Sequence, residues 1–169
     1  MLQIRPLQPD QWRVFKEIRL AALADAPYAF TTQLATVQRR PDWEWEAIVR
    51  RRAADPAGIT FLAFWDERPC AMAACVLTEA GAELLAVWVS PEHRGRKVGA
   101  ALVEYACNWA LERGVQTMIV GVFADNTGAI NFYEGVGFLN GGEVRNDPRQ
   151  PHRPILILSM ELTGRLATS

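Results

Sequence analysis

The chain has 169 residues, half of them hydrophobic and 22% charged, an ordinary balance for one globular domain. Its formal net charge of −1 argues against a general affinity for nucleic acid or for an anionic membrane surface. No apolar run approaches the length of a membrane span, and the N-terminus lacks the basic and then apolar build of a secretion signal.

The cysteines and histidines indicate the cellular compartment and whether a metal site is present. Cys70, Cys75 and Cys107 are odd in number and all lie in apolar segments, which is typical of reduced thiols in a core. We therefore expect a cytoplasmic protein. His93 and His152 show no metal-ligand spacing, so we expect no metal site.

The N-terminal third predicts one strand and two helices. Residues 2–7 alternate apolar and polar side chains, as a strand does. A helix is expected over 9–24, where Asp-Ala-Pro ends it, and a second over about 41–53, with Trp43 and Ile48 among its apolar positions.

The middle of the chain predicts a hairpin, a central strand and a helix. Strands over 59–65 and 70–78 flank a short turn. Residues 84–89 are all apolar, which is typical of a strand covered on both faces. From Val98 to about residue 113 the apolar spacing takes the helical period.

The remaining elements complete the predicted order. They are a strand over 115–123, a short helix over 126–136, a strand over 138–144, a loop over 145–154 and a strand over 155–162. The order β-α-α-β-β-β-α-β-α-β-β predicts an α/β fold with a mixed, mostly antiparallel sheet and a central parallel pair flanked by helices. We expect residues 1–162 to form a single domain and residues 163–169 a loose C-terminal tail.

Cations gather where the central strand gives way to the helix. Arg94, Gly95, Arg96, Lys97 and Gly99 lie around the first helical turn, although the positive end of a helix disfavours cations. A bound phosphate or pyrophosphate would collect these cations together with the free N–H groups. A solvated basic loop, with Gly95 supplying a turn, explains the same residues equally well.

The glycine spacing excludes two well-known phosphate motifs. The chain has neither Gly-x-x-x-x-Gly-Lys-Ser/Thr nor Gly-x-Gly-x-x-Gly. The segment does resemble the acyl-CoA pyrophosphate loop, Gln/Arg-x-x-Gly-x-Gly/Ala, of the GCN5-related N-acetyltransferase (GNAT) superfamily. Arg94 and Gly99 match that motif, while Lys97 stands where its middle glycine usually lies.

A second segment carries the more specific resemblance. Residues 126–138 match the family pattern Asn-x-x-Ala-x-x-Phe-Tyr-x-x-x-Gly-Phe at every named position. Structural roles account for some of these residues as well: Asn126 as a helix N-cap, Tyr133 as a core aromatic and Gly137 as a C-cap. The predicted element order is also that of the family, and the resemblance is weakest before residue 59.

The resemblance implies a binding site for acetyl-CoA and a catalytic acid. It places the cofactor arm between the central strand and the strand over 115–123, with the Val89 amide polarising the thioester carbonyl. Tyr133 would protonate the leaving thiolate. The cofactor-binding residues that it implies are Val87, Val89, Arg94, Gly95, Arg96, Lys97, Val98, Gly99, Ala100, Asn126 and Tyr133.

Glu83 is the candidate general base. It begins the central strand, where simple alternation puts it on one face with Leu85, Val87 and Val89. By resemblance its position is that of the catalytic glutamate of the histone-acetylating branch. An ordinary solvated glutamate at a strand end fits equally well, and many members of the family rely on water chains instead.

The acceptor site is expected between the loops over 25–32 and 145–154, as in the family. Tyr28 and Phe30 are the candidate substrate-binding residues there, and Asp147 or Glu83 would attract a cation. Each of the four could equally be a surface or packing residue. The arginines at 39–40 and 50–52 are interleaved with acids and predict a solvated helix face rather than a nucleic-acid site.

The resemblance thus predicts an enzyme that transfers acetyl from acetyl-CoA directly to a primary amine in a ternary complex. A small-molecule amine is the expected acceptor. The alternatives are a protein N-terminus or lysine as acceptor, or a non-catalytic acyl-CoA-binding domain. Dimers are common in the family, and no sequence feature decides whether this chain forms a homodimer.

Overall fold

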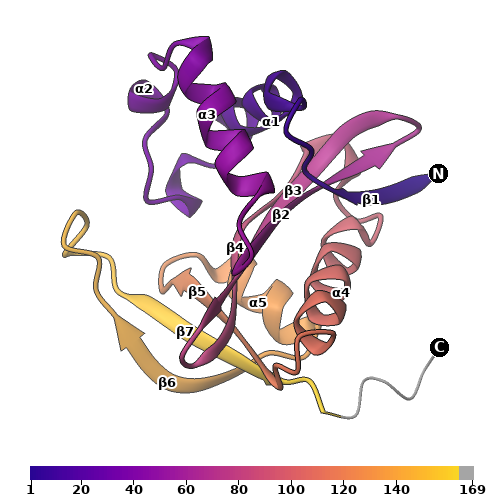
Figure 1. Ribbon diagram of the computed structural model, residues 1–169. Coiled ribbons are helices and arrows are strands. Elements are labelled where there is room, and N and C mark those ends of the chain that lie inside the picture. The colour runs from indigo at the N-terminus through magenta and orange to yellow at the C-terminus, as the bar shows by residue number, and fades with distance from the viewer. Residues whose placement is uncertain (164–169) are drawn as a thin grey trace.

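One seven-stranded sheet organises the molecule, whose computed structural model describes residues 1–163 (Figure 1). The strands are β1 (Leu2–Pro6), β2 (Gly58–Trp65), β3 (Arg68–Thr78), β4 (Gly81–Val89), β5 (Thr117–Phe123), β6 (Leu139–Arg145) and β7 (Ile155–Glu161). Their order is β1-β2-β3-β4-β5-β7-β6, and the β4–β5 pair is the parallel one. The predicted mixed sheet with a central parallel pair is confirmed.

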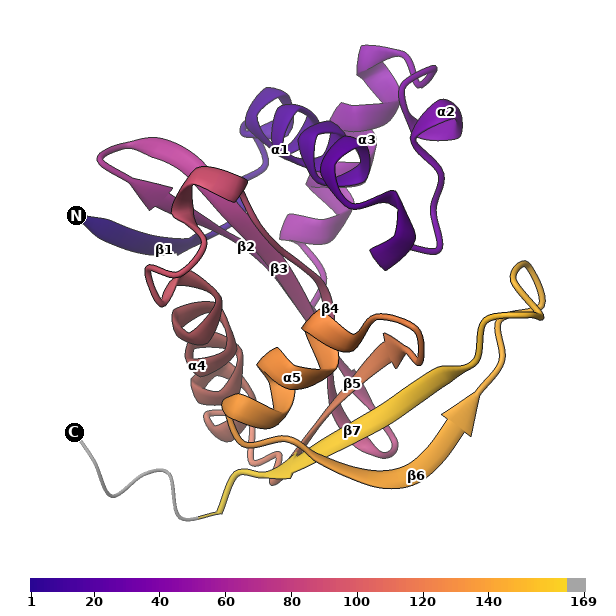
Figure 2. The same cartoon turned by 180° about the vertical axis from the view of Figure 1, so that it is seen from behind.

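Helices pack on both faces of this sheet (Figure 2). They are α1 (Trp12–Asp25), α2 (Leu34–Val37), α3 (Asp42–Ala53), α4 (Val98–Leu111) and α5 (Thr127–Gly135). Alternate residues of β2 separate the two cores: Phe61 joins the core under α4 and α5, and Leu62 joins the core under α1 and α3. The predicted tail lies outside the described residues, apart from residue 163.

The N-terminal third differs from the expectation in detail. The short helix α2 and 3-10 turns at Pro27–Ala29 and Pro91–His93 come in addition to the expected elements. Trp43 is 68% exposed and does not belong to the apolar face of α3. Trp45 and Val49, four residues apart, are the buried positions of that helix.

A bulge in β4 shapes the middle of the sheet. Met72 of β3 lies opposite Trp88 and Ala74 opposite Leu85, so Ala86 and Val87 together oppose the single residue Ala73. Ala86 has a φ of 53°, in the left-handed region. The bulge shifts the alternation of every later residue of β4 by one.

That shift corrects the expected placement of Glu83. Leu84 belongs to the core under α4 and α5, so its neighbour Glu83 faces the other way. Beyond the bulge, Val87 and Val89 pack against the α4–α5 core, whereas Trp88 belongs to the opposite core. Glu83 therefore does not share a face with Val87 and Val89, because simple alternation fails at Ala86.

The same region separates β4 from β5. The parallel pairing covers only Ala82–Leu84 against Met118–Val120, and beyond it the two strands diverge. The apolar run predicted a strand covered on both faces. Leu85 is 39% exposed, so this prediction does not hold along the whole of β4. The divergence leaves one backbone edge of β4 without a paired strand, and this edge faces the site.

Candidate functional site

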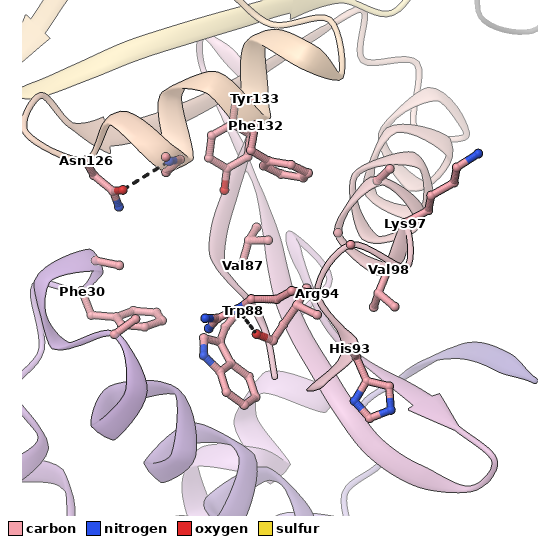
Figure 3. A pocket seen from close by; sticks show the side chains of 18 of the residues that line it. Phe30, Val87, Trp88, His93, Arg94, Lys97, Val98, Asn126, Phe132 and Tyr133 are labelled. Carbon is pink, nitrogen blue, oxygen red and sulfur yellow. Dashed lines mark hydrogen bonds between the residues drawn. The ribbon is translucent and has the colours of Figure 1, made fainter. Parts of the chain in front are cut away.

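A cavity of about 610 Å³ opens where β4 diverges from β5, between the starts of α4 and α5 (Figure 3). Of the residues predicted to bind the cofactor, its walls include Val87, Val89, Arg94, Gly95, Lys97, Val98, Gly99, Ala100, Asn126 and Tyr133. Arg96 is not among them, because its guanidinium lies over the ring of Trp65, 5.4 Å from the centroid. The structure thus gathers two separate sequence motifs around one space.

The start of α4 is built to receive an anion. Lys97 occupies the N-cap position with a φ of 63°, and its side chain makes no capping hydrogen bond. The first intrahelical bond runs from the Ala101 N–H to the Lys97 carbonyl, so the three N–H groups before it lack an intrahelical partner. Glycine adopts this backbone conformation most easily, which explains why the family motif favours glycine where this chain has Lys97.

Arg94 links this turn to α1. Its Nε donates to the Val89 carbonyl at 3.1 Å, and its Nη2 donates to Oδ2 of Asp25. The same carboxylate oxygen accepts a hydrogen bond of 2.8 Å from Nε1 of the buried Trp88. Asp25, at the last turn of α1, therefore holds both the strand and the turn in place.

Tyr133 of α5 lies against the opposite wall. It is 7% exposed, and its ring packs edge-on against Phe132 and Phe138, with centroids 5.0 and 5.5 Å away. Its hydroxyl points into the cavity toward Val87 (Figure 3). Burial raises the pKa of Tyr133 well above its usual value, so the hydroxyl keeps its proton at neutral pH.

Two further features shape the start of α5 and its approach to α4. Oδ1 of Asn126 accepts a hydrogen bond of 3.2 Å from the Ala129 N–H, which is the expected N-cap. A Cβ atom added at Gly99 would lie 3.0 Å from the Phe132 ring. Gly99 therefore serves the close approach of the two helices, and this approach sets the width of the cavity between them.

A second cavity, of about 280 Å³, adjoins the first beside Phe30 and Thr31 of the loop over 25–32. The two share wall residues, among them Phe30, Val87, Asn126 and Tyr133. Of the predicted substrate residues, Phe30 lines both cavities, while Tyr28 lines the first and is 57% exposed. Tyr133 thus lies where the two spaces meet.

The two loops expected to border the acceptor site are in contact. Arg153 donates a hydrogen bond of 2.7 Å from Nη2 to the Tyr28 carbonyl and pairs with Asp125 at 2.8 Å. Asp147 faces neither cavity and binds Arg149 through both carboxylate oxygens. Its charge is thus compensated by that arginine, which lowers the pKa of Asp147.

Glu83 lies apart from the cavity walls. Its side chain is 20% exposed, and Oε1 lies 3.4 Å from Nη1 of Arg145 on β6. Leu84 and Leu85, the next residues of β4, do line the second cavity. A proton passing between Glu83 and that cavity would therefore need an intervening water.

Comparison with known proteins decides the family. A model described as the acetyltransferase (GNAT) family matches residues 17–138, well over half of the chain. The chain belongs to the GNAT family. The family resemblance that the two sequence motifs indicate is therefore confirmed.

Curated GNAT relatives are longer than this chain. Mycothiol acetyltransferase of Renibacterium salmoninarum is 26% identical over 139 residues, which cover 81% of this chain and 40% of the relative. An uncharacterized N-acetyltransferase of Methanocaldococcus jannaschii is 40% identical over 57 residues, covering 34% of this chain and 25% of the relative. The chain thus spans less than half the length of these relatives.

Solved GNAT structures share the fold over their whole length. PaiA N-acetyltransferase of Thermoplasma acidophilum, solved with coenzyme A, has a TM-score of 0.74 at 17% identity, covering 95% of this chain and 99% of that one. Spermidine N-acetyltransferase of Vibrio cholerae, solved with coenzyme A and spermine, has a TM-score of 0.78 at 15% identity and 98% coverage of both chains. At this identity the likeness extends to the fold alone.

Residues 1–163 contain neither a candidate membrane span nor a candidate metal site. No helix there combines the length and apolar character needed to cross a bilayer. No group of three or more His, Cys, Asp or Glu side chains there is arranged to hold a metal ion.

Sequence reasoning missed several wall residues of this GNAT site. Trp88 and His93 flank the pyrophosphate motif, and Phe132 lies inside the second motif, so proximity to the motifs could have indicated them. Arg19 lines the second cavity from α1. Nothing near it in the sequence points to the site, because the fold brings it there from a helix far from either motif.

Proposed function

We propose that this chain is an acetyl-CoA-dependent N-acetyltransferase that moves an acetyl group directly to the primary amine of a small molecule. The observation that carries this proposal is the meeting of two cavities at the Tyr133 hydroxyl. One cavity runs to the cationic start of α4, and the other is bordered by Ala29, Phe30 and Thr31 of the loop over 25–32. A donor and an acceptor bound in the two spaces would meet beside a group that carries a proton.

The first cavity fits acetyl-CoA in shape and charge. The N–H groups at the start of α4, with Lys97 and Arg94 beside them, suit the pyrophosphate. The unpaired edge of β4 near Val87 and Val89 suits the amide groups of the pantetheine arm. Bound in this way, acetyl-CoA would supply an acyl group activated as a thioester.

Residues at the junction would stabilise the negative charge that develops on the acyl oxygen and on the leaving sulfur. The Val89 N–H is proposed to stabilise the oxygen that becomes negative when the amine nitrogen attacks the acyl carbon. As the C–N bond forms and the C–S bond breaks, Tyr133 would give its proton to the sulfur. Its raised pKa supports this role, because a protonated hydroxyl is what a general acid requires.

The amine must also lose a proton, since an alkylammonium has a pKa of about 10. We propose that Glu83 accepts this proton through a water molecule. Its place on β4 directly before Leu84 and Leu85, which line the second cavity, supports the role. Its ion pair with Arg145 holds the carboxylate in one position.

The proposal also covers the setting of the enzyme. All three cysteines are buried, and Cys70 and Cys75 are free thiols, which supports a reducing compartment such as the cytoplasm. Light scattering measures directly whether the chain forms a homodimer, which no sequence feature decides.

Thermal unfolding with and without acetyl-CoA, followed by thiol release with a panel of amines, tests the proposal. Saturating acetyl-CoA should raise the melting temperature, and amines should then release thiol. A rise in melting temperature without turnover on small amines, but with turnover on peptides, would favour a protein acceptor. Stabilisation with no turnover at all would favour an acyl-CoA-binding domain, and no stabilisation would contradict the proposal.

A further inference from the structure

The second cavity carries one charged side chain, and it is a cation. Among the described residues that line this cavity, Arg19 alone is charged; Thr31, Asn126 and Tyr133 add polar groups, and most of the others are apolar. The guanidinium of Arg19 lies over the ring of Phe30, 4.8 Å from its centroid. Phe30 thus holds it at the wall of the cavity.

This partly buried guanidinium lacks a partner for one of its nitrogens. Its Nη1 is buried and has no hydrogen-bond partner among the described residues. Burial first, and then the charges of Arg52 and Arg40, lower the pKa of Arg19 to about 10. The side chain therefore stays charged at neutral pH, in a place where burial and its charged neighbours both oppose the charge.

Two nearby cations have carboxylate partners, whereas Arg19 and its neighbour Arg52 form no ion pair among residues 1–163. Arg40 pairs with Glu44 at 3.2 Å, and Lys16, on the same helix as Arg19, pairs with Asp42 at 2.8 Å. No carboxylate within residues 1–163 forms an ion pair with Arg19. A molecule that the protein binds could supply an anion to Arg19.

The size of the surrounding spaces decides where that anion enters. Arg19 also borders a small pocket of about 40 Å³, together with Arg52 and Thr60. This pocket has room for only a few water molecules, which could accept hydrogen bonds but could not balance the charge. The 280 Å³ cavity is the space that can admit a carboxylate attached to a larger molecule.

We propose that the acceptor is an amine that also carries a carboxylate, and that this carboxylate binds the guanidinium of Arg19. This inference rests on the proposed function and names its substrate class. The planar fork of the guanidinium matches a carboxylate through two parallel hydrogen bonds. Apolar walls, including Leu84, Val120 and Phe123, would cover the carbon chain between the two ends, while the amine lies toward Tyr133.

The same arrangement disfavours polyamines. A second or third ammonium group would lie in a cavity whose walls offer a cation and, among the described lining residues, no carboxylate. The acceptor class is thus expected to differ from that named for the spermidine N-acetyltransferase that shares the fold.

Matched acceptors test the inference. Thiol release from acetyl-CoA is measured with ω-amino carboxylates of increasing length and with amino acids that have apolar side chains. Each acid is compared with its own primary amide, and spermidine is included. The acids should exceed their amides in kcat/KM by about 10-fold or more, the range expected for a hydrogen-bonded charge.

Variants then assign the preference to Arg19. Arg19→Gln should bring the ratio of acid to amide close to one, and Arg19→Lys should keep part of it. Arg13→Gln is the matched control, because Arg13 lies on the same helix with its guanidinium 4.4 Å from the Trp12 ring and lines neither cavity. This control should leave the ratio unchanged, and melting temperatures verify that each variant folds.

The outcomes separate this inference from the proposed function. Turnover of amides or spermidine at the same rate as the acids, or an unchanged ratio in Arg19→Gln, would overturn the inference and leave the acetyltransferase intact. If no amine is acetylated, the proposed function fails, and calorimetry with the amino carboxylates in the presence of coenzyme A still decides the site. Binding that is lost in Arg19→Gln would support the anion site, and the absence of binding to the wild type would overturn it.

Discussion

At the scale of single residues, the account depends most on the Tyr133 hydroxyl. Tyr133→Phe removes the proposed proton donor and little else, because no described residue forms a hydrogen bond with this hydroxyl and the ring keeps its contacts with Phe132 and Phe138. We expect kcat to fall about 100-fold or more, as for loss of a general acid. The dissociation constant of acetyl-CoA, measured by calorimetry, should stay within about 2-fold of the wild-type value. Unchanged kcat would remove the acid role.

Glu83 makes a second, separable prediction. Glu83→Gln keeps the size of the side chain but cannot accept the proton of the amine, so kcat/KM should fall about 10-fold or more. Glu143→Gln is the control. Oε1 of Glu143 lies 3.8 Å from Nε of the same Arg145, but Glu143 is on β6 and not on β4. Equal losses in the two variants would mean that Glu83 acts only by placing Arg145.

Lys97 predicts a difference in stability between two substitutions. Its φ of 63° favours glycine over any residue with a Cβ atom, so Lys97→Gly should be more stable than Lys97→Ala by about 1 kcal/mol. Chemical denaturation measures this difference. The same pair of substitutions at Arg96, whose φ is not positive, should favour alanine instead. Greater stability of Lys97→Ala would contradict the assigned backbone conformation.

At the scale of secondary-structure elements, one carboxylate joins α1, β4 and the turn before α4. Asp25→Ala would leave the buried Trp88 Nε1 without its acceptor and Arg94 without its partner. We expect a loss of about 1–3 kcal/mol of unfolding free energy, the cost of an unsatisfied buried donor. Trp88 fluorescence should change as well.

Asp42→Ala provides the comparison for that loss. Asp42 is 64% exposed and pairs with Lys16 at the surface, so its removal should cost no more than about 1 kcal/mol. Urea denaturation of both variants gives the two values. An equal, small effect in both would show that Asp25 does not hold the elements together.

Comparison of elements also shows what the sequence could predict. The order of helices and strands, apart from the additional short helix α2, and the N-cap Asn126 follow from local patterns and were predicted correctly. The bulge at Ala86 was not, because the apolar run over 84–89 has no break in its pattern. The bulge depends on how β3 pairs with β4, which alternation within one strand does not reveal.

Site residues that are distant from the motifs in the sequence could not be predicted either. Asp25 meets Arg94 across 69 positions of sequence, and Arg19 reaches the second cavity from α1. Neither belongs to a motif, so only the packing of α1 against the sheet brings them to the site. The residues of the two motifs, by contrast, are brought to the site by the short turns at the starts of α4 and α5.

At the scale of the whole molecule, the divergence of β4 and β5 gives the two substrates of the proposed reaction separate binding spaces. The sheet directs Val87 and Val89 toward α4 and α5, where acetyl-CoA would bind. It directs Leu85 toward the second cavity, where the acceptor would bind, and α1 directs Arg19 there. Because the cavities share Tyr133, both substrates could be held at once.

Initial-rate kinetics with both substrates varied tests this central claim most directly. Direct transfer requires acetyl-CoA and the amine to be bound together, so double-reciprocal plots should give intersecting lines. Parallel lines, with an acetylated enzyme that forms in the absence of amine, would mean that the acyl group first passes to a side chain. That result would contradict transfer at the junction of the two cavities.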